Sequence, residues 1–148
     1  MRIYVASSWR NDYQPEVVRG LREVGHDVYD FRNPTDGDHG FHWSEIDGDW
    51  KQWTVEQYIN NLRNPIARDG FAKDYDAMCA SDGCVLLCPC GRSAHLEAGW
   101  FIGRGKPTWI LAAREEPELM YKLATGIHGG MGSMLLAIQE YEDDLAIL

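Results

Sequence analysis

Short apolar runs alternate along the chain with longer stretches in which apolar residues recur at helical spacing. The runs predict strands at Arg2–Ala6, Asp27–Phe31, Cys84–Cys88, Pro107–Ala112 and Thr125–His128. The helical spacing predicts helices at Asp12–Val24, Thr54–Leu62, Pro65–Ala80, Ala94–Ile102 and Pro117–Ala124, and a last helix from Met131. This alternation predicts an α/β fold: a doubly wound, mostly parallel sheet of four or five strands, flavodoxin- or Rossmann-like, with helices on both faces.

The segment from Cys84 to Gly105 is a predicted strand, turn and helix in direct succession. Pro89 ends the strand, and Ser93 is placed to cap the helix. Gly91 and Arg92 complete a polar turn between them. Ligands of open α/β sheets bind at the carboxyl ends of strands, and helix amino termini stabilise anions, so we expect this turn to be part of a functional site.

Glu97 is an acidic residue within this apolar helix, one turn after Ser93. The simplest interpretation is that it complements the helix dipole. However, apolar neighbours such as Leu96 and Phe101 lie all round the helix, so we expect the helix to be largely buried. A buried carboxylate without a partner is costly, and this favours a functional role for Glu97.

A second polar turn, with Ser7, Ser8 and Arg10, follows the first predicted strand. Because parallel strands end at the same edge of a sheet, we expect the two turns to meet there. A further candidate is Asp74, which helical spacing places on the apolar side of its predicted helix. Its neighbour Asp76 points away from that side, so Asp74 is the better candidate for a proton donor.

The segment from Thr35 to Trp53 has no clear period and is long for an ordinary connection. Its aromatic residues argue against disorder, because such side chains normally bury large areas. Two interpretations remain open for this segment and for Trp43 within it. It is either a lid or pocket wall that contacts a substrate, or a cover for an edge of the sheet.

The chain has 148 residues and a formal net charge of −9. This length predicts one domain over residues 1–148, and the negative charge argues against a nucleic acid polymer as the partner, so a small molecule is expected. No apolar run approaches the roughly 20 residues of a membrane span, and the first residues lack the layout of a signal peptide. We therefore expect a cytoplasmic protein with no membrane association.

Four cysteines, Cys79, Cys84, Cys88 and Cys90, crowd one region of the chain. No pair has the CxxC separation typical of structural zinc sites. Cys84 and Cys88 also fall in an apolar run, where cysteine packs as a small hydrophobic residue. The sequence therefore predicts no metal site and, without a secretory signal, no disulfide.

Four stretches resemble the nucleoside 2-deoxyribosyltransferase superfamily, which includes the deoxynucleoside 5′-monophosphate N-glycosidases. They are the RIYVASSWR strand and turn, the segment KDYDAMCASD, the GRSAHLEAG helix and the GKPTWIL strand. Each stretch alone is a weak signal, but their order and spacing together are fairly specific. The resemblance implies an enzyme that acts on a small-molecule nucleoside or nucleotide, forms a homo-oligomer and needs no cofactor.

The resemblance also implies roles for individual residues. Glu97 corresponds to the nucleophile that attacks the anomeric carbon, Asp74 to the group that assists departure of the base, and Tyr4 to a tyrosine lining the same site. One carboxylate and one acid are the pair that cleavage through an oxocarbenium-like state requires, and no metal is needed. Arg10 corresponds to a phosphate-contacting arginine. The candidate substrate-binding residues are Ser7, Ser8, Arg10, Trp43, Gly91, Arg92 and Ser93.

The chain departs from the family pattern at Gly91, where family members place an Asp or a Ser that contacts the 5′ end of the sugar. Arg92 and Ser93, in front of the helix amino terminus, are candidates for a phosphate seat instead. Alternatively, Arg92 is a solvated turn residue.

Several functions remain open from the sequence. The reaction is either hydrolysis or base exchange. An NAD-glycohydrolase-like enzyme and a non-catalytic nucleotide-sensing module are the alternatives, and the presence of both Glu97 and Asp74 favours an enzyme. The histidines His42, His95 and His128 are not proposed as bases, because lone histidines are more often structural.

Overall fold

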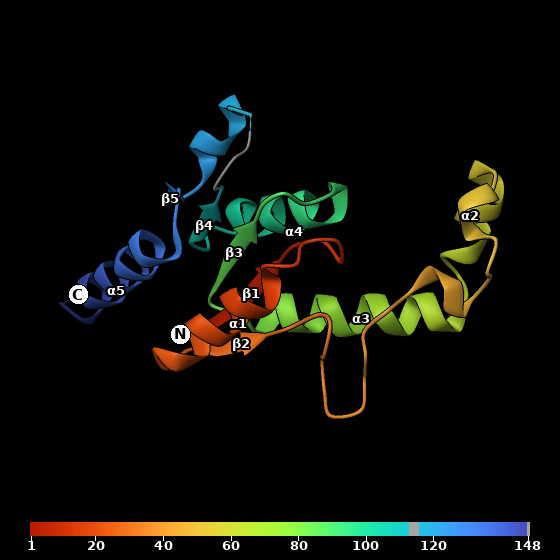
Figure 1. Cartoon of the computed structure of the whole chain (residues 1–148), viewed down its shortest axis with the longest axis horizontal. Helices are drawn as coiled ribbons and strands as arrows, with labels where there is room; N and C mark the ends of the chain where they lie inside the picture. The colour runs from red at the N-terminus through yellow and green to blue at the C-terminus, as the bar shows by residue number, and fades with distance from the viewer. Residues whose placement is uncertain (113–115, 148) are drawn as a thin grey trace. The chain divides into compact units, whose positions relative to one another are not determined.

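Figure 1 shows the computed structural model, which describes residues 1–112 and 116–147. The chain divides into two compact units, one formed by Met1–Tyr29 with Ala80–Leu148 and the other by Asp30–Cys79. The first unit contains the sheet, and the second is the long segment between the second and third strands. The single domain expected over residues 1–148 stays a prediction.

A five-stranded sheet forms the centre of the first unit, and its neighbouring strands pair in parallel. The strands are β1 (Arg2–Ala6), β2 (Asp27–Tyr29), β3 (Gly83–Leu87), β4 (Thr108–Leu111) and β5 (Gly126–His128). They lie in the order β2-β1-β3-β4-β5, which is the order of flavodoxin-like folds. The predicted parallel α/β sheet is confirmed, and its strands lie close to their expected positions.

Helices cover both faces of this sheet, because alternate side chains of each strand point to opposite sides. α1 (Gln14–Glu23) and α5 (Met131–Ile147) pack on one face, and α4 (Arg92–Gly103) packs on the other. The core beneath α1 and α5 consists of Ile3, Val5, Val17, Val18, Leu21, Val28, Val85, Leu87, Trp109, Leu111, Met134 and Ile138. The doubly wound arrangement is therefore confirmed.

α4 differs from its prediction at its start and in its burial. The helix begins at Arg92 with Gly91 as its N-cap, so the prediction that Ser93 caps it is wrong. Its buried residues are Ala94, Ala98 and Phe101. Leu96 is 77% exposed, so the expectation of a largely buried helix is also wrong. The sheet covers only one face of α4, so apolar residues on the outer face of the helix, such as Leu96, do not become buried.

The segment after β4 also differs from its prediction. The spacing predicts an α-helix over Pro117–Ala124, but Leu119–Leu123 form a 3-10 helix, η3. Leu119, Met120 and Leu123 are exposed, so this segment lacks the buried face that normally stabilises a short α-helix.

The second unit contains α2 (Val55–Asn61), most of α3 (Pro65–Ala80) and the 3-10 helices η1 (Trp43–Glu45) and η2 (Trp50–Gln52). A capping box forms at the start of α2: Gln57 N donates to Thr54 Oγ1 at 3.2 Å, and Thr54 N donates to Gln57 Oε1 at 2.8 Å. Within the described residues, no helix combines the length and the apolar character that a membrane crossing requires.

The phase of α3 is only partly as predicted. Asp74 is half-buried and Asp76 is exposed, as the helical spacing predicts. Helical spacing also places Phe71 on the side of Asp74, but its side chain is 70% exposed and stacks on Tyr75 with ring centroids 5.7 Å apart. Apolar side chains one helical turn apart can pack against each other in this way without being buried in a core.

We predict that Leu21→Ala lowers the free energy of unfolding by about 2–5 kcal/mol, because it leaves a cavity where a fully buried side chain packs. Leu96→Ala is the matched control, since its exposed side chain should change stability by no more than about 0.5 kcal/mol. Urea denaturation of both variants measures the difference. Similar losses in the two variants would contradict the arrangement of α1 and α4 on the sheet.

Candidate active site

The carboxyl ends of β1 and β3 form the point where the strand order reverses, since β2 lies beyond β1 and β4 lies beyond β3. In doubly wound folds, ligands bind in the crevice outside the strand ends at such a switch point. The turn after β1 carries Ser7, Ser8 and Arg10, and the turn after β3 leads through Gly91 into α4. The two turns singled out in the sequence therefore follow neighbouring strands.

Two side chains tie these turns together. Ser7 Oγ donates to the backbone oxygen of Leu87 at 3.0 Å, and Asn11 Nδ2 donates to the backbone oxygen of Pro89 at 3.2 Å. Asn11 Oδ1 also accepts from Tyr13 N at 3.0 Å, and the residue is only 6% exposed. Asn11 was not predicted as a site residue, because the sequence of a polar turn does not indicate which of its side chains is buried.

Arg10 extends from the first turn toward solvent. Its backbone N donates to Ser8 Oγ at 3.2 Å, which holds a local turn, and its side chain is exposed. Trp9 beside it is 40% exposed. An exposed guanidinium at this edge is free to meet an anion without first losing a buried environment.

Tyr4 lies on the face of the sheet that α4 covers. Its ring stacks on Tyr29 with centroids 5.3 Å apart and contacts Phe101 of α4 at 5.7 Å. The residue is 1% exposed, so its position is fixed by packing on both sides. In the sheet, Tyr4 pairs with Cys84 of β3.

Glu97 is half-buried on α4, one turn before Phe101. Its charge acts on Cys84: burial raises the pKa of the Cys84 thiol, and the nearby Glu97 carboxylate raises it further. Cys84 therefore stays a neutral thiol, and Glu97 lies on the same side of the sheet as Cys84 and Tyr4. The structure thus places the predicted nucleophile and the predicted tyrosine on one face of the first unit.

Gly91 leaves room at the start of α4. A Cβ added at this position would meet no atom within 4 Å, and its φ of −89° suits any residue. No steric constraint therefore explains why glycine replaces the Asp or Ser of the resembling family. Arg92 and Ser93 follow as the first residues of the helix, and both are exposed.

Asp74 and Trp43 belong to the second unit. Asp74 lines a cavity of about 90 Å³, together with Phe31, Pro34, Asp38, Gly40, Phe41, Glu45, Ile66, Asp69, Gly70 and Lys73. Lys73 Nζ lies 2.8 Å from both Asp38 Oδ2 and Asp69 Oδ2. Its hydrogen bonds with these carboxylates raise the pKa of Lys73, and its bond to Asp38 is the main reason that the pKa of Asp38 is lowered.

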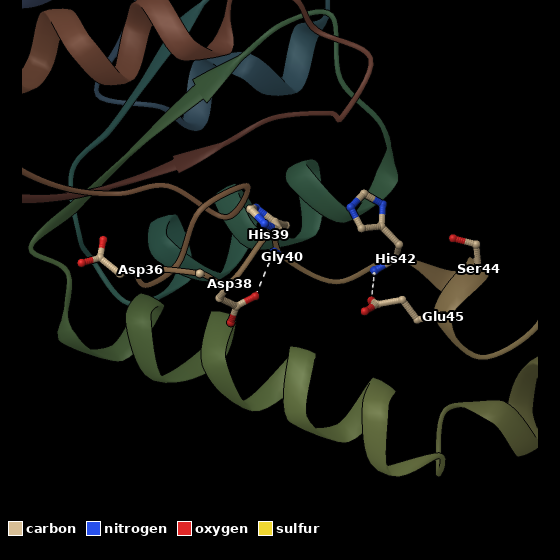
Figure 2. Close-up of a pocket in the computed structure, with 8 residues that line it drawn as sticks. Asp36, Asp38, His39, Gly40, His42, Ser44 and Glu45 are labelled. Atoms are coloured by element: carbon tan, nitrogen blue, oxygen red, sulfur yellow. Dashed lines mark hydrogen bonds between the residues drawn. The ribbon is translucent and has the colours of Figure 1, made fainter.

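An open hollow of about 480 Å³ also lies in the second unit (Figure 2). It is lined by Asp36, Gly37, Asp38, His39, Gly40, His42, Ser44 and Glu45. Two hydrogen bonds shape its wall: Gly40 N donates to Asp38 Oδ1, and His42 N donates to Glu45 Oε2, both at 2.9 Å. The lining is mostly polar, and Trp43 is not part of it.

Trp43 packs among other aromatic rings instead. Its ring contacts Phe41 at 4.8 Å, Trp53 at 5.6 Å and Tyr58 at 5.9 Å, all edge to face. Such contacts account for the order of this segment. Neither the lid nor the sheet-edge interpretation of residues 35–53 is decided by these contacts.

The three histidines set aside in the sequence differ in their surroundings. His42 precedes η1 and pairs with Glu45 in a capping box. Burial lowers the pKa of His128 at the end of β5. His95 is the exception to the structural interpretation, because its ring lies beside two cysteines, Cys88 and Cys90, at the β3–α4 turn. The spacing of these three residues hid this group from sequence analysis.

The structure was compared with known proteins. Searches with protein-family models and among curated proteins found no match. Among solved structures, a 2-deoxyribosyltransferase from Bacillus psychrosaccharolyticus is similar, with a TM-score of 0.56 and 17% identity over 90% of each chain. The CMP N-glycosidase BcmB of Clostridium botulinum has a TM-score of 0.50 and 17% identity, over 94% of this chain and 99% of its own. The resemblance to the nucleoside 2-deoxyribosyltransferase superfamily is therefore confirmed at the level of the fold.

Proposed function

We propose that this protein cleaves the N-glycosidic bond of a nucleoside or deoxynucleoside, or of its 5′-monophosphate. The observation that carries the proposal is the position of Glu97: a half-buried carboxylate on α4, close enough to Cys84 of β3 to raise its pKa, on the sheet face that holds Tyr4. Support comes from the fold, which is shared with a 2-deoxyribosyltransferase and a CMP N-glycosidase.

In the proposed reaction, a carboxylate oxygen of Glu97 forms a bond to the anomeric carbon while the bond from that carbon to the base nitrogen breaks. The electron pair of the broken bond leaves with the base, which takes up a proton from an acid. Water or a second base then attacks the anomeric carbon and releases Glu97. The sum of the two steps is hydrolysis in the first case and base exchange in the second.

The remaining residues are proposed to bind and assist. Tyr4 is held rigidly by its neighbours, so its hydroxyl is suited to orienting Glu97 or the sugar. Asp74 is proposed as the acid that protonates the base, and Trp43 as a contact for the substrate. Both belong to the second unit, so their role depends on how that unit meets the substrate.

A 5′-phosphate is proposed to bind between the two turns. Arg10 supplies an exposed charge, and Ser8 and Ser93 are proposed to donate their hydroxyl groups, while Ser7 is proposed to hold the turn through its bond to the backbone oxygen of Leu87. The amino terminus of α4 adds backbone N–H groups and a favourable dipole, and Arg92 adds a second charge. The open space at Gly91 leaves the approach to this terminus clear. The homo-oligomer implied by the resemblance stays a prediction.

Glu97→Gln should reduce turnover by at least about a thousandfold while folding and substrate binding survive, because the amide keeps the shape but cannot act as a nucleophile. Chromatography of released base, after incubation with nucleosides, their 5′-monophosphates and NAD, measures this. Glu23→Gln on the exposed side of α1 is the control. Near-normal turnover in Glu97→Gln would refute the nucleophile, and binding without any release by the native protein would indicate a sensing module.

Arg10→Ala should weaken 5′-monophosphates by roughly tenfold to a hundredfold relative to free nucleosides, since a charge-assisted hydrogen bond contributes about 1.5–3 kcal/mol. Values of kcat/KM for matched nucleoside and nucleotide pairs give this ratio. Arg19→Ala, an exposed arginine on α1, should leave the ratio unchanged. Equal losses on both kinds of substrate would show that Arg10 does not read the phosphate.

Asp74→Asn should slow the reaction by about 10²–10⁴-fold on natural substrates and much less on an analogue with an activated leaving group. A general acid works only when protonated, so the fall in rate that it imposes as pH rises should also disappear. Asp76→Asn is the control, because Asp76 is exposed two positions further along α3. The acid's role fails if Asp74→Asn slows both substrates equally, or if Asp76→Asn is the more damaging change.

A further inference from the structure

Two cysteines and a histidine converge at the β3–α4 turn. Cys88 directly follows β3, Cys90 lies two residues later, and His95 is on the first turns of α4. The sulfur atoms of Cys88 and Cys90 are 4.0 Å apart, and Cys90 Sγ lies 3.7 Å from His95 Nδ1. One ligand atom from each of the three residues lies within 4.8 Å of the other two.

The separations that involve Cys90 are close to the distances between pairs of ligand atoms in a tetrahedral zinc site. Zinc binds sulfur at about 2.3 Å and imidazole nitrogen at about 2.0–2.1 Å, so tetrahedral angles place two sulfurs about 3.8 Å apart and a sulfur and a nitrogen about 3.6 Å apart. The separations of Cys90 Sγ from Cys88 Sγ and from His95 Nδ1 need adjustments of only a few tenths of an ångström, and the ligand atoms of Cys88 and His95 lie within 4.8 Å of each other. Core packing alone does not require thiols and an imidazole to meet at these distances.

Tyr121 of η3 supports the histidine from the other side. Its hydroxyl lies 2.8 Å from His95 Nε2 and 3.5 Å from Cys88 Sγ, and the two rings stack. His95 Nδ1 lies 2.9 Å from the backbone oxygen of Gly91, which only accepts, so Nδ1 carries the proton. Metal binding would move that proton to Nε2, and the Tyr121 hydroxyl could accept from it, as the partners of metal-bound histidines do.

Accessibility separates this group from the other cysteines. Cys88 is 5% exposed, whereas Cys90 is partly exposed and His95 is exposed, so an ion can reach the three ligands from solvent. Cys84 is fully buried, and Cys79 is exposed in the second unit. Among the described residues, only this group brings three possible metal ligands together.

We propose that Cys88, Cys90 and His95 form a binding site for Zn²⁺, with a fourth position left for water or another ligand. Two thiolates and one imidazole are a ligand set that zinc takes in proteins. The site connects the end of β3 with the start of α4, so a bound ion braces the turn on the side of Tyr121. The sequence predicted no metal site because no cysteine pair has the CxxC separation, so this proposal departs from that prediction. It does not depend on the proposed reaction.

The test is a calorimetric titration of the full-length, reduced protein with Zn²⁺, and a parallel titration with Co²⁺ followed by absorption. We expect one ion per chain and, with Co²⁺, a thiolate-to-metal charge-transfer band together with the visible bands of a tetrahedral ion. Absence of stoichiometric Zn²⁺ binding, or a Co²⁺ spectrum without thiolate bands, overturns the proposal. Both readouts use the native sequence, so they do not depend on a variant that folds.

Variants then assign the ligands. Cys90→Ser and His95→Gln change accessible positions and should each abolish the thiolate-containing site or weaken it by more than a hundredfold. Tyr121→Phe should weaken it by about 10–100-fold, the usual effect of losing a partner of a metal ligand. Cys79→Ser is the matched control and should bind as the native protein does. Unchanged affinity in both Cys90→Ser and His95→Gln overturns the site even if the protein binds zinc elsewhere.

Discussion

The candidate site depends on how the turn after β3 is held against the turn after β1. Parallel strands align their ends, but they leave the following turns free to diverge. Here Ser7 and Asn11 donate to backbone oxygens of Leu87 and Pro89 across the switch point. Each bond contributes only about 0.5–1.5 kcal/mol net, but leaving a buried donor such as the Asn11 amide unpaired costs about 1–3 kcal/mol. The penalty for separating the turns therefore exceeds the gain from either bond.

Packing on the α4 face of the sheet then fixes the positions of Tyr4 and Glu97. Tyr4 is pressed between Tyr29 and Phe101, and Glu97 lies one turn from Phe101 on the same helix. The contact of Phe101 with Tyr4 holds α4 against β1, and it therefore also helps to fix the position of Glu97 over the sheet. The high pKa of Cys84 matters for the same reason, because a neutral thiol adds no negative charge beneath Glu97. The carboxylate that we propose as the nucleophile therefore has a neutral thiol, not a thiolate, on its side of the sheet.

The sequence predicts the alternation of strands and helices because strands buried on both faces leave short continuous apolar runs, whereas helices that pack one face on the sheet leave apolar residues at helical spacing. It predicts poorly which apolar side chains meet a neighbour. Leu96 and Phe71 fit helical faces but are largely exposed, and the segment at Leu119 lacks the packing that an α-helix needs. The Cys88, Cys90 and His95 group was missed for a different reason: a strand, a turn and a helix bring these residues together at a spacing that common zinc motifs do not use.

Gly91 links the two chemistries that we propose for this turn. Its backbone oxygen accepts from His95 Nδ1, and it is also the N-cap of α4, in front of the proposed phosphate seat. An ion bound at Nδ1 removes the proton that makes this hydrogen bond, so the Gly91 carbonyl is left with the longer bond from the backbone N–H of His95, at 3.4 Å, and the cap must adjust. Glycine, with no side chain and open space around it, gives that adjustment little resistance. If the ion shifts this cap and so changes the affinity for phosphate, linkage requires phosphate to change the affinity for the ion by the same factor.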